Sequence, residues 1–330
     1  MASSAALTIF RSFVIPALLI CLLVQIPAQA EEPAPKPVQK ITPGKVIIPT
    51  DRMRRIWGEL ISLDLSTRTG SFRREADDQV MNFIVMPYAE LLHHATLGDL
   101  QDFHVGERAI FRLHENEQGE WIYLTYIQDE MNMMHGHKEF YFVDRIDPST
   151  GELICTQANT DQSFIRQKGI VISTDSETRC WKAGKPATFS EIQVGDPLRA
   201  KTRGTGSGKA RIAWEIFLDE QSLLEFQAKQ KAVHLARMDK EGIPGYVDQI
   251  APDSVAVTLF PEGSVLFDKF KNGDTVEIAP AGVDRLPTHE RIPGKITEIQ
   301  KTGRTRQVQI RCSSTSSFKP AGVMRLWTSP

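Results

Sequence analysis

Cysteine is scarce in this chain, with four residues among 330. This small number excludes the disulfide-dense class of small secreted domains. An excess of charge of one sign is also lacking, because 39 basic and 41 acidic side chains give a formal net charge of −2. The balance argues against the basic surface with which nucleic-acid-binding proteins contact phosphates. After residue 30, no apolar run reaches the ~20 residues that a membrane-spanning helix needs.

Sequence signatures of common enzymes are lacking as well. The chain has no nucleophile-elbow motif, no His-Glu-x-x-His zinc motif and no Cys-x-x-Cys pair. The doublet His93-His94 is expected in a short helix over residues 88–94 that Pro87 begins, where neighbouring side chains point apart. Catalytic groups can still converge from distant parts of a chain, so an enzyme of unrecognised type remains one interpretation.

The first thirty residues predict a signal peptide. Arg11 precedes an apolar run over residues 13–26, and Ala28-Gln29-Ala30 offers the small residues that a signal peptidase reads. Cleavage after Ala30 removes one charged side chain and leaves a net charge of about −3. The Pro-rich residues 31–45 predict an extended, disordered tether. The protein is therefore expected to be periplasmic or secreted.

The most informative positive feature is a repeated turn. Residues 103–107, 192–196 and 270–274 share a pattern that ends in Gly106-Glu107, Gly195-Asp196 and Gly273-Asp274. Each turn follows a strand-like segment, which begins at residue 56, 142 or 246, and a fourth such segment begins at residue 294. The shared glycine predicts positive φ at an equivalent place in each unit. Repetition of this kind indicates tandem small β units.

Short strands, turn residues and a small helical segment before the fourth strand favour OB-like barrels in the first two units. The predicted fold is mainly β, with tandem OB-like small β-barrels and one long linker helix. The expected organisation is a signal peptide, a tether, a first barrel, a second barrel, the linker helix and a third β unit, over residues 1–30, 31–45, 46–130, 138–218, 219–241 and 243–330 respectively.

The linker helix is predicted from helical spacing of apolar residues. Ser222 and Glu225 have the form of a capping box, and Gly242 suits the position after the last turn. The apolar stripe should pack on a neighbouring barrel, and it comprises Leu224, Ala228, Ala232, Leu235 and Met238. The basic residues are expected mostly on other faces, and these are Lys229, Lys231, Arg237 and Lys240.

Residues 178–189 and the following Glu191-Ile192-Gln193-Val194-Gly195-Asp196 carry a family resemblance. This pattern of strands, turn and hairpin resembles an exported bacterial family of repeated OB-like small β-barrel domains of unknown function. The resemblance covers most of the chain after residue 30. Its motifs are structural turns, so it implies a fold and no particular activity.

One segment has the composition of a metal site. Thioether and imidazole groups together suit Cu(I), and the segment offers Met131, Met133, Met134, His135 and His137. The first repeat also resembles the periplasmic copper-binding chaperone of metal efflux systems, in which a Trp and a Met-x-Met pair accompany a His. Here Met81 and Met86 are five residues apart and no Trp accompanies them. The alternative is that the methionines pack between two barrels.

These observations leave three interpretations. The first is an exported, non-enzymatic binding or scaffold protein of the cell envelope, with a protein or glycan partner, without a cofactor and not bound to nucleic acid. Five dispersed tryptophans could stack on sugars, although barrel cores also use such rings. The second is a periplasmic copper-binding protein, and the third is the unrecognised enzyme. Cys155 and Cys180 lie in one repeat and are the predicted disulfide, with buried thiols as the alternative.

Overall fold

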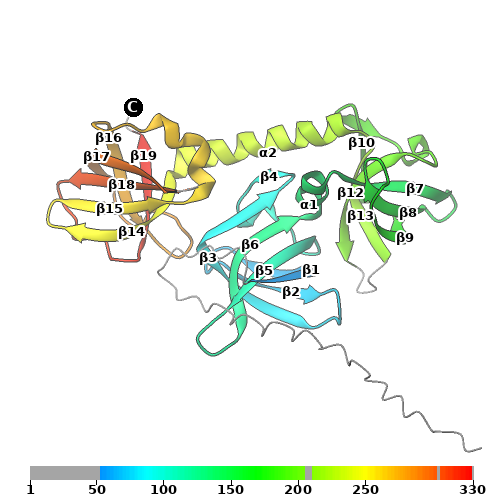
Figure 1. Cartoon of the computed structure of the whole chain (residues 1–330), viewed down its shortest axis with the longest axis horizontal. Coiled ribbons are helices and arrows are strands. Elements are labelled where there is room, and N and C mark those ends of the chain that lie inside the picture. The colour runs from blue at the N-terminus through cyan, green and yellow to red at the C-terminus, as the bar shows by residue number, and fades with distance from the viewer. Residues whose placement is uncertain (1–52, 205–209, 303–304, 329–330) are drawn as a thin grey trace, which may run out of the picture. The chain divides into compact units, whose positions relative to one another are not determined.

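The computed structural model describes residues 53–204, 210–302 and 305–328. All of them belong to one compact unit, Val38–Pro330. Three closed β-barrels follow one another along the chain, and Figure 1 colours them from blue through green to red. The prediction of a mainly β chain of tandem OB-like barrels with one long linker helix is confirmed. The predicted signal peptide and tether lie outside the described residues.

In barrel 1 the strands pair in the order β2-β1-β5-β6-β3, and pairing of β2 with β3 closes the ring. Only the β3–β6 pairing is parallel within this ring. Its elements are β1 (Arg54–Asp64), β2 (Thr69–Arg74), β3 (Val80–His93), β4 (Thr96–Leu97), the 3-10 helix η1 (Leu100–Asp102), β5 (Arg108–Glu115) and β6 (Trp121–Asp129). Helix α1 (Glu130–His137) then leads into the next barrel.

Barrel 2 repeats this topology, with the order β13-β12-β7-β8-β9 and a parallel β13–β9 pairing that closes it. A short hairpin of two further strands extends the sheet beside β13. Its elements are β7 (Glu139–Asp147), β8 (Glu152–Asn159), β9 (Ile165–Ser173), β10 (Arg179–Lys182), β11 (Lys185–Ala187), the 3-10 helix η2 (Phe189–Glu191), β12 (Pro197–Gly204) and β13 (Ala210–Phe217). Both short 3-10 helices precede the fourth barrel strand, as the sequence pattern predicts.

After α2 (Glu220–Glu241), barrel 3 is built differently, as an antiparallel ring in the order β14-β15-β18-β17-β16-β19. Its elements are β14 (Ile243–Ala251), β15 (Ser254–Leu259), the 3-10 helix η3 (Pro261–Lys269), β16 (Thr275–Ala281), β17 (Ile292–Thr302), β18 (Thr305–Cys312) and β19 (Val323–Thr328). Bulged strands β14 and β17 each form a hairpin with the strand that follows. Barrel 3 therefore consists of two similar halves.

The repeated turns have one structural role. Gly106, Gly195 and Gly273 have φ values of 90°, 94° and 96°, as predicted. Their N–H groups donate to the carbonyls of Leu60, Val143 and Ile296, each at a bulge in the opposing strand. The third turn thus pairs with β17, whereas the sequence pattern matched it to the segment at residue 246. Each turn therefore hydrogen-bonds to a bulged strand, which belongs to the same barrel in barrels 1 and 2 and to the same half of the barrel in barrel 3.

The helix expected over residues 88–94 is wrong, because β3 continues through it to His93. Pro87 lies where the pairing of β3 with β6 is interrupted, between Val85 and Glu90. A proline is tolerated at such a bulge because no ladder hydrogen bond needs its missing N–H. Burial of Tyr88, Ala89 and Leu91 stabilises the longer strand.

Helix α2 buries only the C-terminal part of the predicted stripe. Leu224, Ala228 and Ala232 are exposed, Leu235 is half-buried and Met238 is buried. The other buried side chains of its second half are polar, namely Gln230, His234 and Arg237. The cap is Asp219, whose side chain accepts from the Ser222 backbone N–H, so Ser222 lies inside the helix. Toward barrel 1 the helix makes hydrogen bonds, from Gln227 to the Ala95 carbonyl and from Gln230 and Arg237 to Asp102. Toward barrel 2 it packs Leu223 and Phe226 in the apolar core.

Candidate functional site

A cleft of about 520 Å³ lies at the boundary between barrels 1 and 2. Barrel 1 contributes three histidines from the end of β3 and from the turn before β5, namely His93, His94 and His104. Barrel 2 contributes an indole, two acidic side chains, two basic side chains and a hydroxyl, namely Trp214, Glu177, Glu215, Arg179, Lys201 and Ser176. The cleft is thus polar, of mixed charge, and has one aromatic wall.

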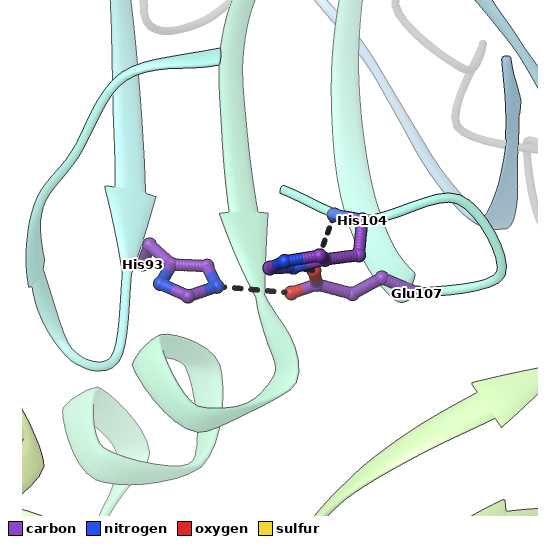
Figure 2. Close-up of side chains that lie close together, drawn as sticks. All are labelled: His93, His104 and Glu107. Atoms are coloured by element: carbon purple, nitrogen blue, oxygen red, sulfur yellow. Dashed lines mark hydrogen bonds and ion pairs between the residues drawn. The ribbon is translucent and has the colours of Figure 1, made fainter. Parts of the chain in front are cut away.

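The turn of the first repeat supplies a buried acid behind the residues that line this cleft. In all three turns the final acid accepts the N–H of the residue three positions earlier, and these acids are Glu107, Asp196 and Asp274. Glutamate is one methylene longer than aspartate. The second carboxylate oxygen of Glu107 therefore extends to the boundary between barrels 1 and 2, where it contacts Lys201. Figure 2 shows Glu107 and His104 on this turn facing His93 at the end of β3.

Glu107 is completely buried, and its charge is balanced from the other barrel. Lys201 Nζ of β12 lies 3.0 Å from Glu107 Oε1 and 2.7 Å from His93 Nε2. Burial alone would raise the pKa of the Glu107 carboxyl, but the Lys201 ammonium brings it well below its usual range. Burial likewise opposes the ammonium, yet Glu107 and other carboxylates raise the pKa of Lys201. Both groups are therefore charged in the folded protein.

Hydrogen bonds define the tautomer of His93. Gln230 Nε2 of α2 donates to Asp102 Oδ2 at 3.0 Å, which leaves Gln230 Oε1 as an acceptor 3.1 Å from His93 Nδ1. Nδ1 of His93 therefore carries a proton. Nε2 lies 2.7 Å from Lys201 Nζ and 3.5 Å from Glu107 Oε1, between an ammonium and a carboxylate.

A second buried charge cluster lies beside the first. Glu130 at the start of α1 accepts from Arg108 Nη1 of barrel 1 at 2.9 Å, and it also pairs with Arg211 of barrel 2 at 3.3 Å. Tyr141 donates to the same oxygen, and the Thr202 N–H and hydroxyl donate to the other at 3.1 and 2.6 Å. Every acceptor position of this carboxylate is thus used in joining the barrels.

Two groups of side chains in the described ranges have metal-ligand geometry. The first is His93, His104 and Glu107, and the second is His93, His94 and Asp129, with ligand atoms within 4.8 Å of one another. Asp129 already accepts the backbone N–H groups of His94 and Asn132, both at 2.7 Å. His94 Nε2 lies 3.1 Å from Glu215 Oε2. In the first group His104 is exposed, and the Lys201 ammonium lies against both His93 and Glu107.

The predicted copper ligands occupy two environments. Met131, Met133 and Met134 are buried in the apolar core that α1 shares with barrel 2. His135 and His137 lie in the last turn of α1, where His135 Nδ1 is 3.4 Å from Glu220 Oε1 and His137 is exposed. The copper site stays a prediction, and metal analysis of the protein after exposure to copper would test it.

Cys155 and Cys180 are buried free thiols in the core of barrel 2, and Cys312 is a free thiol buried in barrel 3. The structure does not form the predicted Cys155–Cys180 bridge. Burial raises the pKa of Cys155 to about 12 and that of Cys180 to about 11. Both side chains therefore serve as apolar core residues in this structure.

Sequence reasoning missed His93, His94, His104 and Glu107 as one group. His93-His94 was expected on a helix, whereas His93 ends a strand and His94 has φ of 47°. A usable signal was present in the repeated turn. The first copy has His and Glu where the others have Gln193 and Asp196, or Lys271 and Asp274.

Comparison with known proteins adds little to this description. No protein-family model matches the chain, and a search of curated proteins finds no match. Among solved structures, the chain is similar to "drosophila Unr CSD456" with 14% identity. The match covers 74% of this chain and 90% of that one, but its TM-score of 0.18 is too low to support any argument. No described helix combines the length and apolar sequence needed to span a membrane.

Proposed function

We propose that this chain is an exported, non-enzymatic binding protein of the cell envelope, and that the cleft between barrels 1 and 2 is its ligand site. Tandem OB-like barrels are compatible with a binding or scaffold role. The observation that supports the proposal is the cleft itself, whose volume lies within the range of small-molecule sites. Its polar groups come from both barrels, so a ligand there would contact both.

A short glycan is the ligand class that we propose for this cleft. Trp214 is a half-buried indole that lines the cleft. His104 meets its ring edge-on with centroids 6.3 Å apart, and the Arg203 guanidinium lies 5.6 Å from the ring centroid. Glu177, Arg179 and Glu215 supply both acceptors and donors for hydroxyl groups. The near-neutral charge is our reason to prefer a sugar to a nucleic acid.

The test is a titration of the purified protein with neutral β-linked tetrasaccharides, followed by tryptophan fluorescence and calorimetry. We expect saturable binding that Trp214→Leu reduces at least about fivefold, if a sugar gains on the order of the 1–3 kcal/mol that a nucleobase gains by stacking on one aromatic ring. Trp121→Leu is the matched control, since Trp121 lies on β6 and is not part of the cleft. Equal loss in both variants, or no binding of any sugar, would contradict the glycan proposal.

Export has a separate test, because residues 1–30 lie outside the described ranges. Mass spectrometry of the protein from its native host should find Glu31 at the N-terminus. Osmotic-shock or culture fractions should contain this form. An intact chain that begins at Met1 and remains with the cytoplasmic fraction would contradict export without affecting the cleft.

A further inference from the structure

We infer that His93, His104 and Glu107 form a binding site for a divalent transition metal, of which Zn²⁺ is the best fit. This inference names a second ligand class for the cleft and rests on the proposed function as a binding protein. Two imidazole nitrogens and one carboxylate are a donor set that Zn²⁺ uses when one coordination position stays open. The open position faces the cleft, which both histidines line.

The ligand atoms are prepared for a cation in three ways. His93 Nδ1 is engaged by Gln230, so that Nε2 is the nitrogen turned toward Glu107, and such an outer hydrogen bond is typical of metal-bound imidazoles. Glu107 is 0% exposed, and its Oε1 lies 3.5 Å from His93 Nε2, with the Lys201 ammonium as the cation between them. Its other oxygen is held by the backbone N–H of His104 at 3.1 Å.

The third ligand can adjust. The His104 side chain is 68% exposed, and its Nδ1 lies 3.9 Å from Glu107 Oε2. It comes from the turn, so a small rotation of this side chain would close the site without disturbing the barrel core (Figure 2). His93 and Glu107 are buried, whereas His104 is exposed at the cleft. An ion could therefore enter from the cleft on the side of His104.

The Lys201 ammonium already occupies the position that a cation would take. It lies 3.0 Å from Glu107 Oε1 and 2.7 Å from His93 Nε2, which shows that this point favours positive charge. Binding of Zn²⁺ therefore requires Lys201 to turn away toward Glu215 and the cleft. Lys201 would act as an internal competitor that lowers the affinity of the site.

The experiment is calorimetric titration of the full chain with ZnCl₂, together with Co²⁺ titration followed by visible absorption. We expect one Zn²⁺ per chain and tetrahedral d–d bands with Co²⁺. His104→Ala should weaken binding at least about tenfold, while its exposed position leaves the melting temperature unchanged. Gln193→Ala, at the equivalent position of the second turn, is the matched control and should bind as the parent does.

Lys201→Met should bind Zn²⁺ more tightly than the parent, because the competing ammonium is gone. Failure of the parent to bind Zn²⁺, or binding that His104→Ala leaves unchanged, would overturn the inference. Loss of the metal in His135→Ala/His137→Ala, with retention in His104→Ala, would also overturn it and place the ion on the Met/His segment. If Zn²⁺ does not bind while tetrasaccharides still bind at Trp214, the metal inference is wrong and the proposed glycan site is unaffected.

Discussion

At the scale of single residues, the three turn glycines show how a backbone angle specifies the repeat. A Cβ at Gly195 would meet no atom within 4 Å, so only its φ of 94° opposes a side chain. We expect Gly195→Ala to lower the free energy of unfolding by about 1–2 kcal/mol, measured in urea.

Gly136 provides the matched control, because it lies in α1 with equally open space around its Cα and without positive φ. Gly136→Ala should raise the free energy of unfolding by up to about 1 kcal/mol through helix propensity. Equal effects of the two substitutions would show that the angle at Gly195 carries no cost.

His114 predicts a dependence of stability on pH. It is completely buried in β5, neither ring nitrogen has a hydrogen-bond partner among the described residues, and burial lowers its pKa to about 4. The unfolded chain, with a His pKa of about 6.5, binds more protons between those values, so stability should fall as pH falls from about 6.5 to 4. With allowance for solvent screening, the loss due to this side chain should be about 2 kcal/mol.

His114→Leu should remove that part of the pH dependence, as measured by urea unfolding at a series of pH values. His137→Ala is the control, because His137 is exposed at the end of α1. A parent and a His114→Leu variant with parallel pH profiles would argue that His114 is hydrated in solution.

At the scale of elements, the sequence predicted where strands and turns occur better than it predicted which face of a helix contacts the rest of the protein. The repeated glycine turns can be recognised in the sequence itself, because positive φ is a local requirement that few residues satisfy. The predicted stripe of α2 is buried only at Met238 and half-buried at Leu235, because an apolar stripe indicates the buried face only where the partner surface is apolar. Here the partner is the loop end of barrel 1, where Asp102 is a hydrogen-bond acceptor.

Arg237 of α2 tests this polar docking directly. Its guanidinium is buried and donates to both carboxylate oxygens of Asp102, at 3.1 and 2.9 Å. Arg237→Ala would leave Asp102 largely buried without its charge partner, at a cost of about 3 kcal/mol. We expect earlier urea unfolding and new protease cleavage within residues 220–241.

Ala228→Asp is the matched control, since Ala228 belongs to the predicted apolar stripe but is exposed. Its cost should stay within about 0.7 kcal/mol, the scale of helix propensity. If Ala228→Asp proved more harmful than Arg237→Ala, the apolar stripe would be the docking face after all.

At the scale of the whole molecule, buried charges join barrel 1 to both of its neighbours. Glu107 and Glu130 connect it with barrel 2. Asp99 pairs with Arg68 at 3.1 Å and lies 3.9 Å from Arg285 of barrel 3, which also pairs with Glu262. Burial would raise the pKa of Asp99, but Arg68 and Arg285 lower it below its usual range. No local sequence pattern predicts these pairs, because each partner is distant along the chain.

The same long-range pairing explains why the candidate site was hidden in the sequence. His93 comes from the end of β3, Glu107 from a turn and Lys201 from within β12, and more than ninety residues separate Glu107 from Lys201. Repetition predicted the barrels because each barrel is built from neighbouring segments. It could not predict the boundary between barrels, where the copies differ from one another.

Glu130 is the substitution that would separate the stability of barrels 1 and 2. Glu130→Gln removes a carboxylate that pairs with both Arg108 and Arg211. Arg108 keeps its ion pair with Glu75, whereas Arg211 has no second ion pair within the described residues. A buried guanidinium without its partner costs about 3–5 kcal/mol.

Calorimetry should show one endotherm for the parent and two for the variant, because barrels that lose their shared charges no longer unfold together. Asp175→Asn, which weakens a partly exposed pair with Arg203, should cost less than about 1 kcal/mol and keep one transition. A Glu130→Gln variant that melts earlier but still in one transition would show that these charges stabilise the barrels without coupling them.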